Sequence, residues 1–388
     1  MDLKERASEL EKFYISGHYV AEAGDLDKSA EIYEQWHKLY PRDTIPINNL
    51  GLAYASFGEY DKWLPLALEE MKIEPDNSFS YQDLTDAYQA VNRIDEAKAV
   101  ADTAVAKKLD SIGTHRFLLA YAYFTKNPAE MDRQLAFAHG KPEEHFMLRG
   151  KAAIEFHQGK LRQSSQTIAE AKEVAEKHGA KEFAALLDTE DGFRLSLVGN
   201  CRAARVAALA SLQRFPAGLN RSWAAITLAF CGDQAQAQKI MDGLLKEYPD
   251  GTLVHLAWHP LVLAAGDLQH YKYDDSLKVL EPGRRVELGF GPVNNPFALP
   301  YFRGITYLKQ NDGEHAAHEF RKILEYNYIY NYSEFLPLSQ LQLARAYMLQ
   351  KNIEKAKTSY QDFLAAWKDA DPDIPVLKEA KAEYERLQ

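Results

Sequence analysis

Apolar and small residues recur along the chain at intervals of three and four, the spacing that places side chains on one face of a helix. In the stretch "NNLGLAYASFGEYDKW", residues 48–63, Leu50, Gly51 and Tyr54 form one such stripe. Gly58 follows as a turn residue, and Trp63 begins the stripe of a second helix. The pattern predicts two helices joined by a short turn and packed against each other.

The same unit returns at a constant interval further along the chain. Leu50 is matched by Leu84 and Pro41 by Pro75, each pair 34 apart. This is the period of the tetratricopeptide repeat (TPR), a helix–turn–helix unit that stacks on its neighbours. We therefore predict an all-α fold of about ten helix pairs, stacked as a right-handed superhelical solenoid. The register is weakest between residues 111 and 216.

The unit has a physical basis. A small residue such as Gly51 lets the second helix approach the first closely, and Tyr54 fills the space beside it with its hydroxyl near water. Pro75 ends the second helix, because proline cannot continue a helical hydrogen-bond ladder. These residues are thus expected to pack rather than to form a site.

The repeats divide the chain into four parts. We expect N-terminal repeats in 1–142, degenerate helical repeats in 143–280, a connector in 281–300, and C-terminal repeats with a capping helix in 301–388. The connector holds three glycines and four prolines in twenty residues, so it cannot be helical throughout. It is either a connector packed on the edge of the solenoid, which we favour, or a functional loop.

Composition narrows the class of protein. A 46% hydrophobic and 26% charged content is ordinary for a folded soluble chain, and the net charge of −10 disfavours binding to nucleic acid or anionic lipid. No apolar run is long enough to span a bilayer, and the charged start "MDLKERASELEKF" does not resemble a signal peptide. A cytoplasmic location is the default expectation if Met1 is the natural start.

Few residues suggest chemistry. Cys201 and Cys231 cannot build a disulfide framework or a metal site, and we expect two buried free thiols rather than one bridge. His255 and His259 have the i, i+4 spacing of zinc ligands, but no third ligand is evident.

A second histidine pair, His315 and His318, also lacks matching carboxylates on a second helix. The phosphate-binding loop, the Gly-x-Ser-x-Gly elbow and the kinase signatures are absent from the sequence. We therefore expect a non-enzyme without cofactor or metal.

The remaining candidate site is the groove. In a helical solenoid the first helix of each repeat faces the concave side, where a protein or peptide partner could bind. In the repeat register, the groove-facing residues of the first three repeats are Tyr14, His18, Asn48, Asn49, Leu52, Phe79, Gln82, Asp86 and Gln89. Each could equally be an ordinary solvated side chain.

A run of alternating tyrosines, "EYNYIYNYSEF", follows a predicted helix near residue 326. We favour packing of these tyrosines over a partner-facing ledge, through which the chain could also self-associate.

TPR proteins that capture the C-terminal carboxylate of heat-shock chaperones have a similar repeat spacing and use a clamp of Lys, Asn, Asn, Lys and Arg. Here Asn49 fits one clamp position, but Tyr14, His18, Phe79 and Asp83 occupy the others. Without the cations, carboxylate capture is not expected. The groove better suits an extended or helical peptide held by apolar anchors.

Several stretches together resemble one group of proteins. They are "RASELEKFYISGHYV", "YPRDTIPINNLGLAYASFGEYDK" and the C-terminal "LARAYMLQKNIEKAKTSYQDFLAAWKDADPDIPVLKEAKAEYERL", in which the box Trp367–Asp373 is the most specific element. The chain resembles the C-terminal TPR regions of bacterial, acidobacterial-type transmembrane serine/threonine kinases. The departures lie at 326–337 and 281–300.

This resemblance implies a region that senses or recruits a partner, extracytoplasmic if the chain is part of a membrane-spanning kinase. No kinase domain is present, so no kinase activity carries over. The expected function is a non-catalytic protein-binding scaffold. The alternative is a small-molecule- or metal-responsive regulator that uses the 281–300 connector and the pair His255 and His259.

Overall fold

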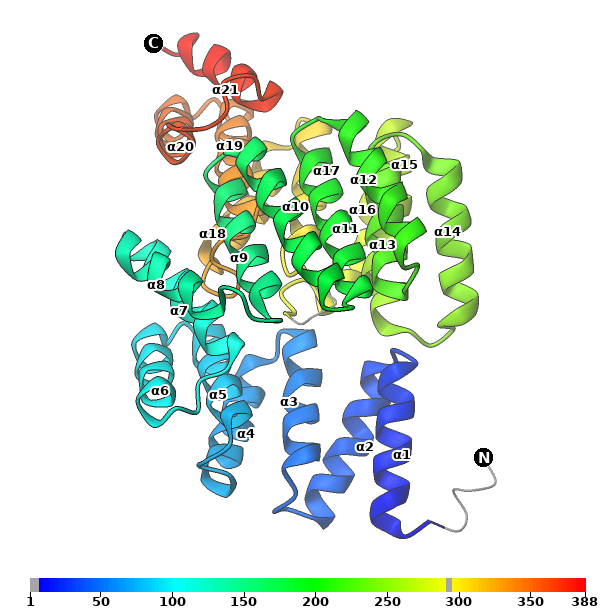
Figure 1. Ribbon diagram of the computed structural model, residues 1–388. Helices are drawn as coiled ribbons and strands as arrows, with labels where there is room; N and C mark the ends of the chain where they lie inside the picture. Colours follow the sequence, from blue (N-terminus) through cyan, green and yellow to red (C-terminus); the bar gives the residue numbers. More distant parts are fainter. Residues whose placement is uncertain (1–6, 291–294) are drawn as a thin grey trace.

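The computed structural model describes residues 7–290 and 295–388, and these segments are built from helices that pack as antiparallel pairs (Figure 1). Within them there are ten pairs and a final helix, as the sequence predicts. The first four pairs are α1 (Glu9–Glu22), α2 (Leu26–Leu39), α3 (Thr44–Phe57), α4 (Tyr60–Ile73), α5 (Ser78–Ala90), α6 (Ile94–Lys107), α7 (Ile112–Phe124) and α8 (Pro128–Ala138).

The later pairs include one π-helical segment, η2, and one 3₁₀ segment, η3. They are α9 (Glu144–His157), α10 (Leu161–Lys177), α11 (Lys181–Leu197), α12 (Cys201–Arg214), α13 (Gly218–Phe230), α14 (Gln234–Glu247), η2 (Val254–Trp258), α15 (His259–Gln269), α16 (Tyr273–Leu280), η3 (Glu281–Arg285), α17 (Ala298–Lys309), α18 (Gly313–Glu325), α19 (Phe335–Leu349), α20 (Ile353–Ala366) and the unpaired α21 (Pro375–Glu385).

Polar caps begin the first helices of successive repeats at the same register. Asp43, Asn77 and Ser111 recur at the repeat interval and accept hydrogen bonds from backbone N–H groups in the first turns of α3, α5 and α7. The turns between paired helices also recur, because Gly24 and Gly58 both adopt left-handed backbone with φ near +77° and +76°. The repeat period is therefore visible in backbone conformation.

Glycine sets the approach of the paired helices, as expected. A Cβ atom on Gly51 would lie 2.5 Å from Trp63 Cδ1, and one on Gly17 would lie 2.7 Å from a ring carbon of Tyr33. Tyr54 is only partly buried, and its hydroxyl donates to Glu34 Oε1 at 2.5 Å. The stripe around Gly51 therefore packs one helix against the next.

The middle of the chain keeps the helix pairs but changes their spacing. Helices α9, α11 and α13 begin at residues 144, 181 and 218, so the interval is 37 rather than 34. Helices α10 and α11 each have 17 residues, longer than the 11 to 14 of the first eight helices. This lengthening explains why the sequence register fades there.

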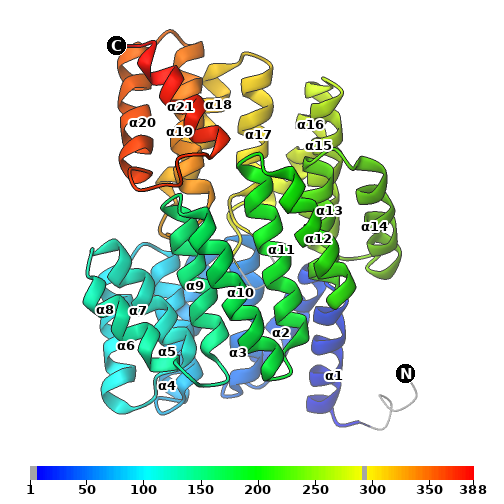
Figure 2. The ribbon, with the colours of Figure 1, turned by 45° about the horizontal axis from the view of Figure 1, so that its top comes forward.

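The superhelix folds back on itself, so that repeats far apart in the sequence touch. Helices α1–α8 form one layer and α9–α21 lie above it (Figures 1 and 2). The Thr252 N–H donates to Gly24 O at 2.9 Å, and the Leu26 N–H donates to Thr252 Oγ1 at 3.0 Å. We call these contacts the first clamp.

The second clamp uses the Trp367–Asp373 box. The Trp367 indole donates to His157 O at 3.1 Å, and the Asp371 N–H donates to Gly159 O at 3.0 Å. Arg162 adds an ion pair with Asp373 at 2.7 Å. The box that carries the family resemblance thus fastens the C-terminal repeats to the α9–α10 turn.

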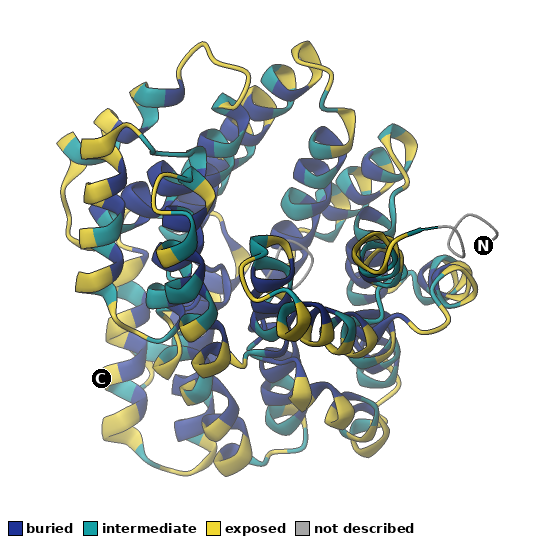
Figure 3. Ribbon diagram, turned by 90° about the horizontal axis from the view of Figure 1, so that it is seen from below, coloured by how far each residue is buried: buried dark blue, intermediate teal, exposed yellow. Residues whose placement is uncertain are grey.

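Buried segments of the helices mostly face one another, and exposed segments concentrate on the turns and outer helices (Figure 3). The largest core cluster runs through most of the repeats and includes Trp63, Trp223, Phe302 and Trp367. Smaller separate clusters lie between α1 and α3, between α5 and α7, and between α7 and α11.

Candidate functional site

The chain's own connector packs on the inner face of the superhelix, the side formed by the first helices of the repeats. It covers the C-terminal end of α3, which we call the upper part of this face. The Phe290 N–H donates to Ala55 O at 2.9 Å, at the C-terminal end of α3, and the Tyr60 hydroxyl donates to Leu288 O. Arg285 pairs with Asp27 of α2. Residues 285–290 of the expected connector thus pack across the superhelix on the first two repeats. Residues 291–294 lie outside the described part of the chain.

The connector also forms ion pairs with α17 and α18. Glu287 accepts a hydrogen bond from Lys322 Nζ at 2.7 Å and from the guanidinium of Arg303, which is fully buried. Arg303 in turn bonds Glu319 Oε2 at 2.9 Å. Arg284 also donates to Glu319 Oε1 at 3.1 Å, so five charged side chains form one network beneath the connector, which makes this segment part of the core.

The tyrosine run fills the next part of the inner face. Gln89 Nε2 donates to Tyr328 O at 2.9 Å, and His157 Nδ1 donates to Ser333 O at 3.1 Å. Tyr332 is buried against the α7–α9 cluster, and Tyr330 packs on Tyr332 with ring centroids 4.9 Å apart. The packing interpretation is confirmed for these two tyrosines.

Two of these contacts recur at the repeat interval. Ala55 and Gln89 lie 34 residues apart at the C-terminal ends of α3 and α5, and each contacts one of the two connecting segments, as does His157 at the end of α9. The chain thus occupies the upper end of its own groove. Sequence reasoning had placed Gln89 in the groove but could not identify what it contacts there.

Several large apolar side chains on the first helices of the first three repeats are exposed. Among the predicted groove residues, Tyr14 is 49% exposed, Leu52 40% and Phe79 64%. Ile45, one repeat before Phe79 at the same register position, is 39% exposed. We call these four residues the apolar row; they come from α1, α3 and α5.

The predicted amide residues are already engaged within the chain. Asn48 donates to Asp83, and Asn49 Nδ2 donates to Ile45 O at 3.0 Å. Gln82 accepts from Ser111 Oγ at 2.7 Å. His18 is also engaged, since its Nδ1 donates to a backbone oxygen of α1. These side chains shape the groove, and a partner could bond them only through their remaining donors and acceptors.

A carboxyl pair lies beneath the groove between α4 and α5. Burial raises the pKa of Glu70 to about 7 and that of Asp83 to about 6. Ser80 donates to Glu70 at 3.2 Å and Asn48 donates to Asp83, so both carboxyls have partners inside the repeat pair.

Two charged side chains on the inner face have no such partner. Asp86 of α5 and Arg116 of α7 are partly buried, and neither side chain makes a hydrogen bond or ion pair to a residue that the structure describes. Burial raises the pKa of Asp86 to about 7, and the charge of Arg116 partly opposes that shift. They lie near each other without pairing.

A deeper charge network joins α9, α11 and the start of α19. Arg149 bonds both oxygens of Glu190, at 2.5 and 2.9 Å, and Arg194 lies 3.8 Å from Glu190 and 4.0 Å from Glu334. No sequence signal linked these residues, because their separation in the chain reaches 185 positions. The network lies beneath the tyrosine run.

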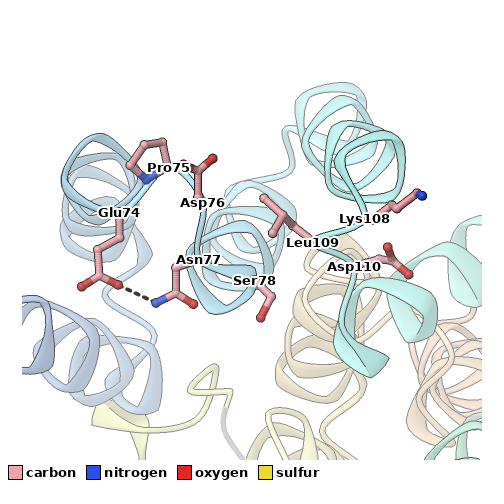
Figure 4. Close-up of a pocket in the computed structure, with 8 residues that line it drawn as sticks. All are labelled: Glu74, Pro75, Asp76, Asn77, Ser78, Lys108, Leu109 and Asp110. Carbon is pink, nitrogen blue, oxygen red and sulfur yellow. Dashed lines mark hydrogen bonds between the residues drawn. The ribbon is translucent and has the colours of Figure 1, made fainter.

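A polar groove of about 700 Å³ lies between the α4–α5 and α6–α7 turns (Figure 4). Glu74 accepts hydrogen bonds from Asn77 at 2.5 Å and from Thr44 at 2.8 Å. Asp110 pairs with His115 at 2.9 Å. Two of its four described charged groups are therefore already engaged within the chain, and only Pro75 and Leu109 supply apolar lining for a small molecule.

The histidine pairs do not assemble a metal site in the described residues, which contain no group of three potential His, Cys, Asp or Glu ligands. His255 lies in the π-helical segment, where the wider winding alters the i, i+4 relation, and its Nε2 donates to Pro249 O at 2.8 Å. His315 pairs with Asp312 at 2.7 Å.

The prediction for the cysteines was wrong. Cys201, at the start of α12, and Cys231, at the end of α13, form a disulfide with their Cα atoms 5.4 Å apart. They are 30 residues apart, close to one repeat, so neighbouring repeats bring both to the same edge of the array. Periodicity could have indicated this pairing.

No protein-family model matches the chain. Among solved structures it is similar to the APC/C hetero-tetramer Cut9–Hcn1 (11% identity over 99% of this chain and 84% of that one, TM-score 0.48). It is also similar to a tetratricopeptide repeat protein from Parabacteroides merdae (16%, 70% and 98%, TM-score 0.40) and to yeast Tom70 (12%, 97% and 95%, TM-score 0.31).

At such low identities these likenesses concern the kind of fold alone. The chain is an all-α TPR-type superhelix, as its own helix pairs and repeat register establish. None of its described helices is both long and apolar enough to cross a bilayer. Function has to be argued from its surfaces.

Proposed function

We propose that the chain is a non-catalytic scaffold that binds an extended segment of a protein partner along the lower inner face. The observation that carries the proposal is the apolar row, four exposed large side chains on the first helices of three successive repeats, of which Ile45 and Phe79 share one register position. Such residues exposed together on a concave surface are typical of a protein-binding groove. The upper end of the groove is closed to a partner by the connector and the tyrosine run.

The predicted contact residues enter this proposal in two roles. Tyr14, Leu52 and Phe79 supply apolar contact, while Asp86 supplies charge. The remaining predicted residues, His18, Asn48, Asn49, Gln82 and Gln89, set the shape of the groove through their intramolecular hydrogen bonds.

The relation to the sensor or recruitment region of a bacterial serine/threonine kinase remains part of the proposal. The second clamp gives the Trp367–Asp373 box of that resemblance a structural role. The disulfide between Cys201 and Cys231 favours an oxidising compartment over the cytoplasm expected by default. Alkylation of the protein in its native cell before lysis would detect two free thiols if the compartment is reducing.

The test is a selection of displayed random dodecapeptides on the full chain. We expect enriched peptides whose binding, measured by fluorescence polarisation, falls at least about tenfold in a Leu52→Ala/Phe79→Ala variant. The matched control is Tyr271→Ala, because Tyr271 is 79% exposed but lies outside the groove. Melting temperatures should stay nearly unchanged in both variants, since all three side chains are exposed.

Enriched peptides that bind both variants as tightly as the parent chain would refute the groove as the binding surface. A selection that enriches no peptide would count against the scaffold proposal itself.

A further inference from the structure

We propose that the partner segment carries apolar side chains followed by a basic and then an acidic side chain, read along the groove from α1 to α7. This inference rests on the proposed function and specifies its partner. It depends on the order of side chains along the first helices. Exposed apolar side chains come first, an acidic side chain without an ion-pair partner among the described residues follows, and a basic one comes last.

The apolar end lies on α1 and α3. Helix α3, "TIPINNLGLAYASF", contains no charged residue, and its Ile45 and Leu52 are exposed, as is Tyr14 on the first helix of the preceding repeat. Phe79 continues the row onto α5. A partner gains here by burying apolar side chains, at about 25 cal/mol for each Å² removed from water.

The acidic position follows one repeat later. Asp86 lies one full repeat interval after Leu52 and therefore occupies the same register position on the next first helix. Its carboxylate has no hydrogen-bond or ion-pair partner among the described residues. A lysine or arginine of the partner could lay its aliphatic stem on Leu52 and place its charged head at Asp86.

The basic position lies on the next first helix, α7. Arg116 follows Gln82 by the same repeat interval, in the register row that also holds Tyr14 and Asn48. It is partly buried and interacts electrostatically with Glu190 and Asp86, but no described acidic group lies within ion-pair distance of its guanidinium. An unpaired arginine in this setting can bind a carboxylate through two parallel hydrogen bonds.

Asp86 and Arg116 do not satisfy each other, although each lies in the other's field. A partly buried charge without a partner is costly, so an oppositely charged pair held apart on a groove wall favours a ligand that supplies both complements. An acidic or a purely basic partner would meet repulsion at one of the two positions. The arrangement therefore selects a charge order as well as apolar content.

The spacing can be estimated. Packed helix axes lie about 8–10 Å apart and an extended chain advances about 3.3 Å per residue, so one repeat corresponds to about three residues of the partner. The matching segment is Leu-x-x-Leu-x-x-Lys-x-x-Glu, with x as Gly or Ser. The control peptide exchanges only the Lys and the Glu, so that composition and net charge are identical.

Both fluorescein-labelled peptides are titrated against the full chain. We expect the Lys-then-Glu peptide to bind about tenfold more tightly, the scale of one well-placed charge pair. Asp86→Asn and Arg116→Gln should each reduce this preference, and the double reversal Asp86→Lys/Arg116→Glu should invert it. If the reversed variant fails to fold, the loss of preference in Asp86→Asn and Arg116→Gln still tests the inference.

If the two peptides bind equally and Phe79→Ala weakens both, the charge order is wrong and the groove proposal stands. If neither peptide binds, the inference is also wrong, and the library selection decides separately whether the groove binds peptides at all. A preference that survives the double reversal unchanged would likewise overturn the inference.

Discussion

Replacing Trp367 by alanine should loosen two distant parts of the molecule together. The Trp367 side chain is 2% exposed, stacks near Phe363 with ring centroids 4.9 Å apart, and donates its indole N–H to His157 O at 3.1 Å. Truncation of a buried tryptophan costs about 3–5 kcal/mol, and the carbonyl oxygen left without its donor adds about 1 kcal/mol. We expect a loss of about 4 kcal/mol in the local stability of the clamp.

Amide hydrogen exchange on the full chain, resolved by peptide, measures this loss. Protection should fall in α20 and α21 and equally in the α9–α10 turn, because the clamp joins these segments. Trp367→Phe is the graded control, expected to cost about 1–2 kcal/mol because it keeps most of the apolar surface and loses the N–H donor. Tyr271→Ala, at an exposed site, should stay within about 0.5 kcal/mol.

The reasoning would be refuted by a loss below about 1 kcal/mol, the range of a surface contact. It would equally be refuted by faster exchange confined to α20 and α21 with an unchanged α9–α10 turn.

Three further predictions concern single contacts. Removing the bridge with Cys201→Ser should lower stability by about 3–4 kcal/mol, the entropy of a 30-residue loop, whereas adding reductant to the variant should change its melting temperature no further. Burial raises the pKa of Glu70 from 4.5 to about 7, so the folded chain retains a proton that the unfolded chain loses, and stability should fall by about 2–3 kcal/mol as pH rises from 4.5 through 7. Glu70→Gln should flatten melting temperature against pH, and an unchanged slope would exclude Glu70 as the cause. Gly51→Ala should cost about 1–3 kcal/mol in urea unfolding, because its Cβ would meet Trp63 at 2.5 Å, and a stabilised variant would contradict the close-approach explanation.

The repeating parts of the fold were predictable because they are local. Gly51, Gly58 and Pro75 each act on residues within one helix pair, and the repeat register carries them from unit to unit. The register also placed Leu52 and Phe79 on a face away from the paired helix, and both side chains are exposed. In the middle of the chain the interval is 37 residues, so a register of 34 no longer predicts which residues are equivalent.

The contacts between repeats that lie far apart in the sequence were not predictable from the register. Whether Thr252 reaches Gly24, or Gln89 reaches the tyrosine run, depends on the accumulated rotation over many repeats. A small change of angle at each interface, invisible in sequence, adds up to many ångströms across the array. For the same reason the packing of the connector and the tyrosine run against the first helices could not be predicted.

The two clamps also limit how this array can vary in length. An open solenoid can gain or lose a unit anywhere, because each repeat contacts only its neighbours. Here an inserted or deleted repeat between residues 24 and 252, or between 159 and 371, would turn the clamp partners away from each other. Gene duplication of a single unit, the usual route by which repeat proteins grow, is therefore tolerated only outside those intervals, and designed versions of this scaffold must keep the number of repeats inside them.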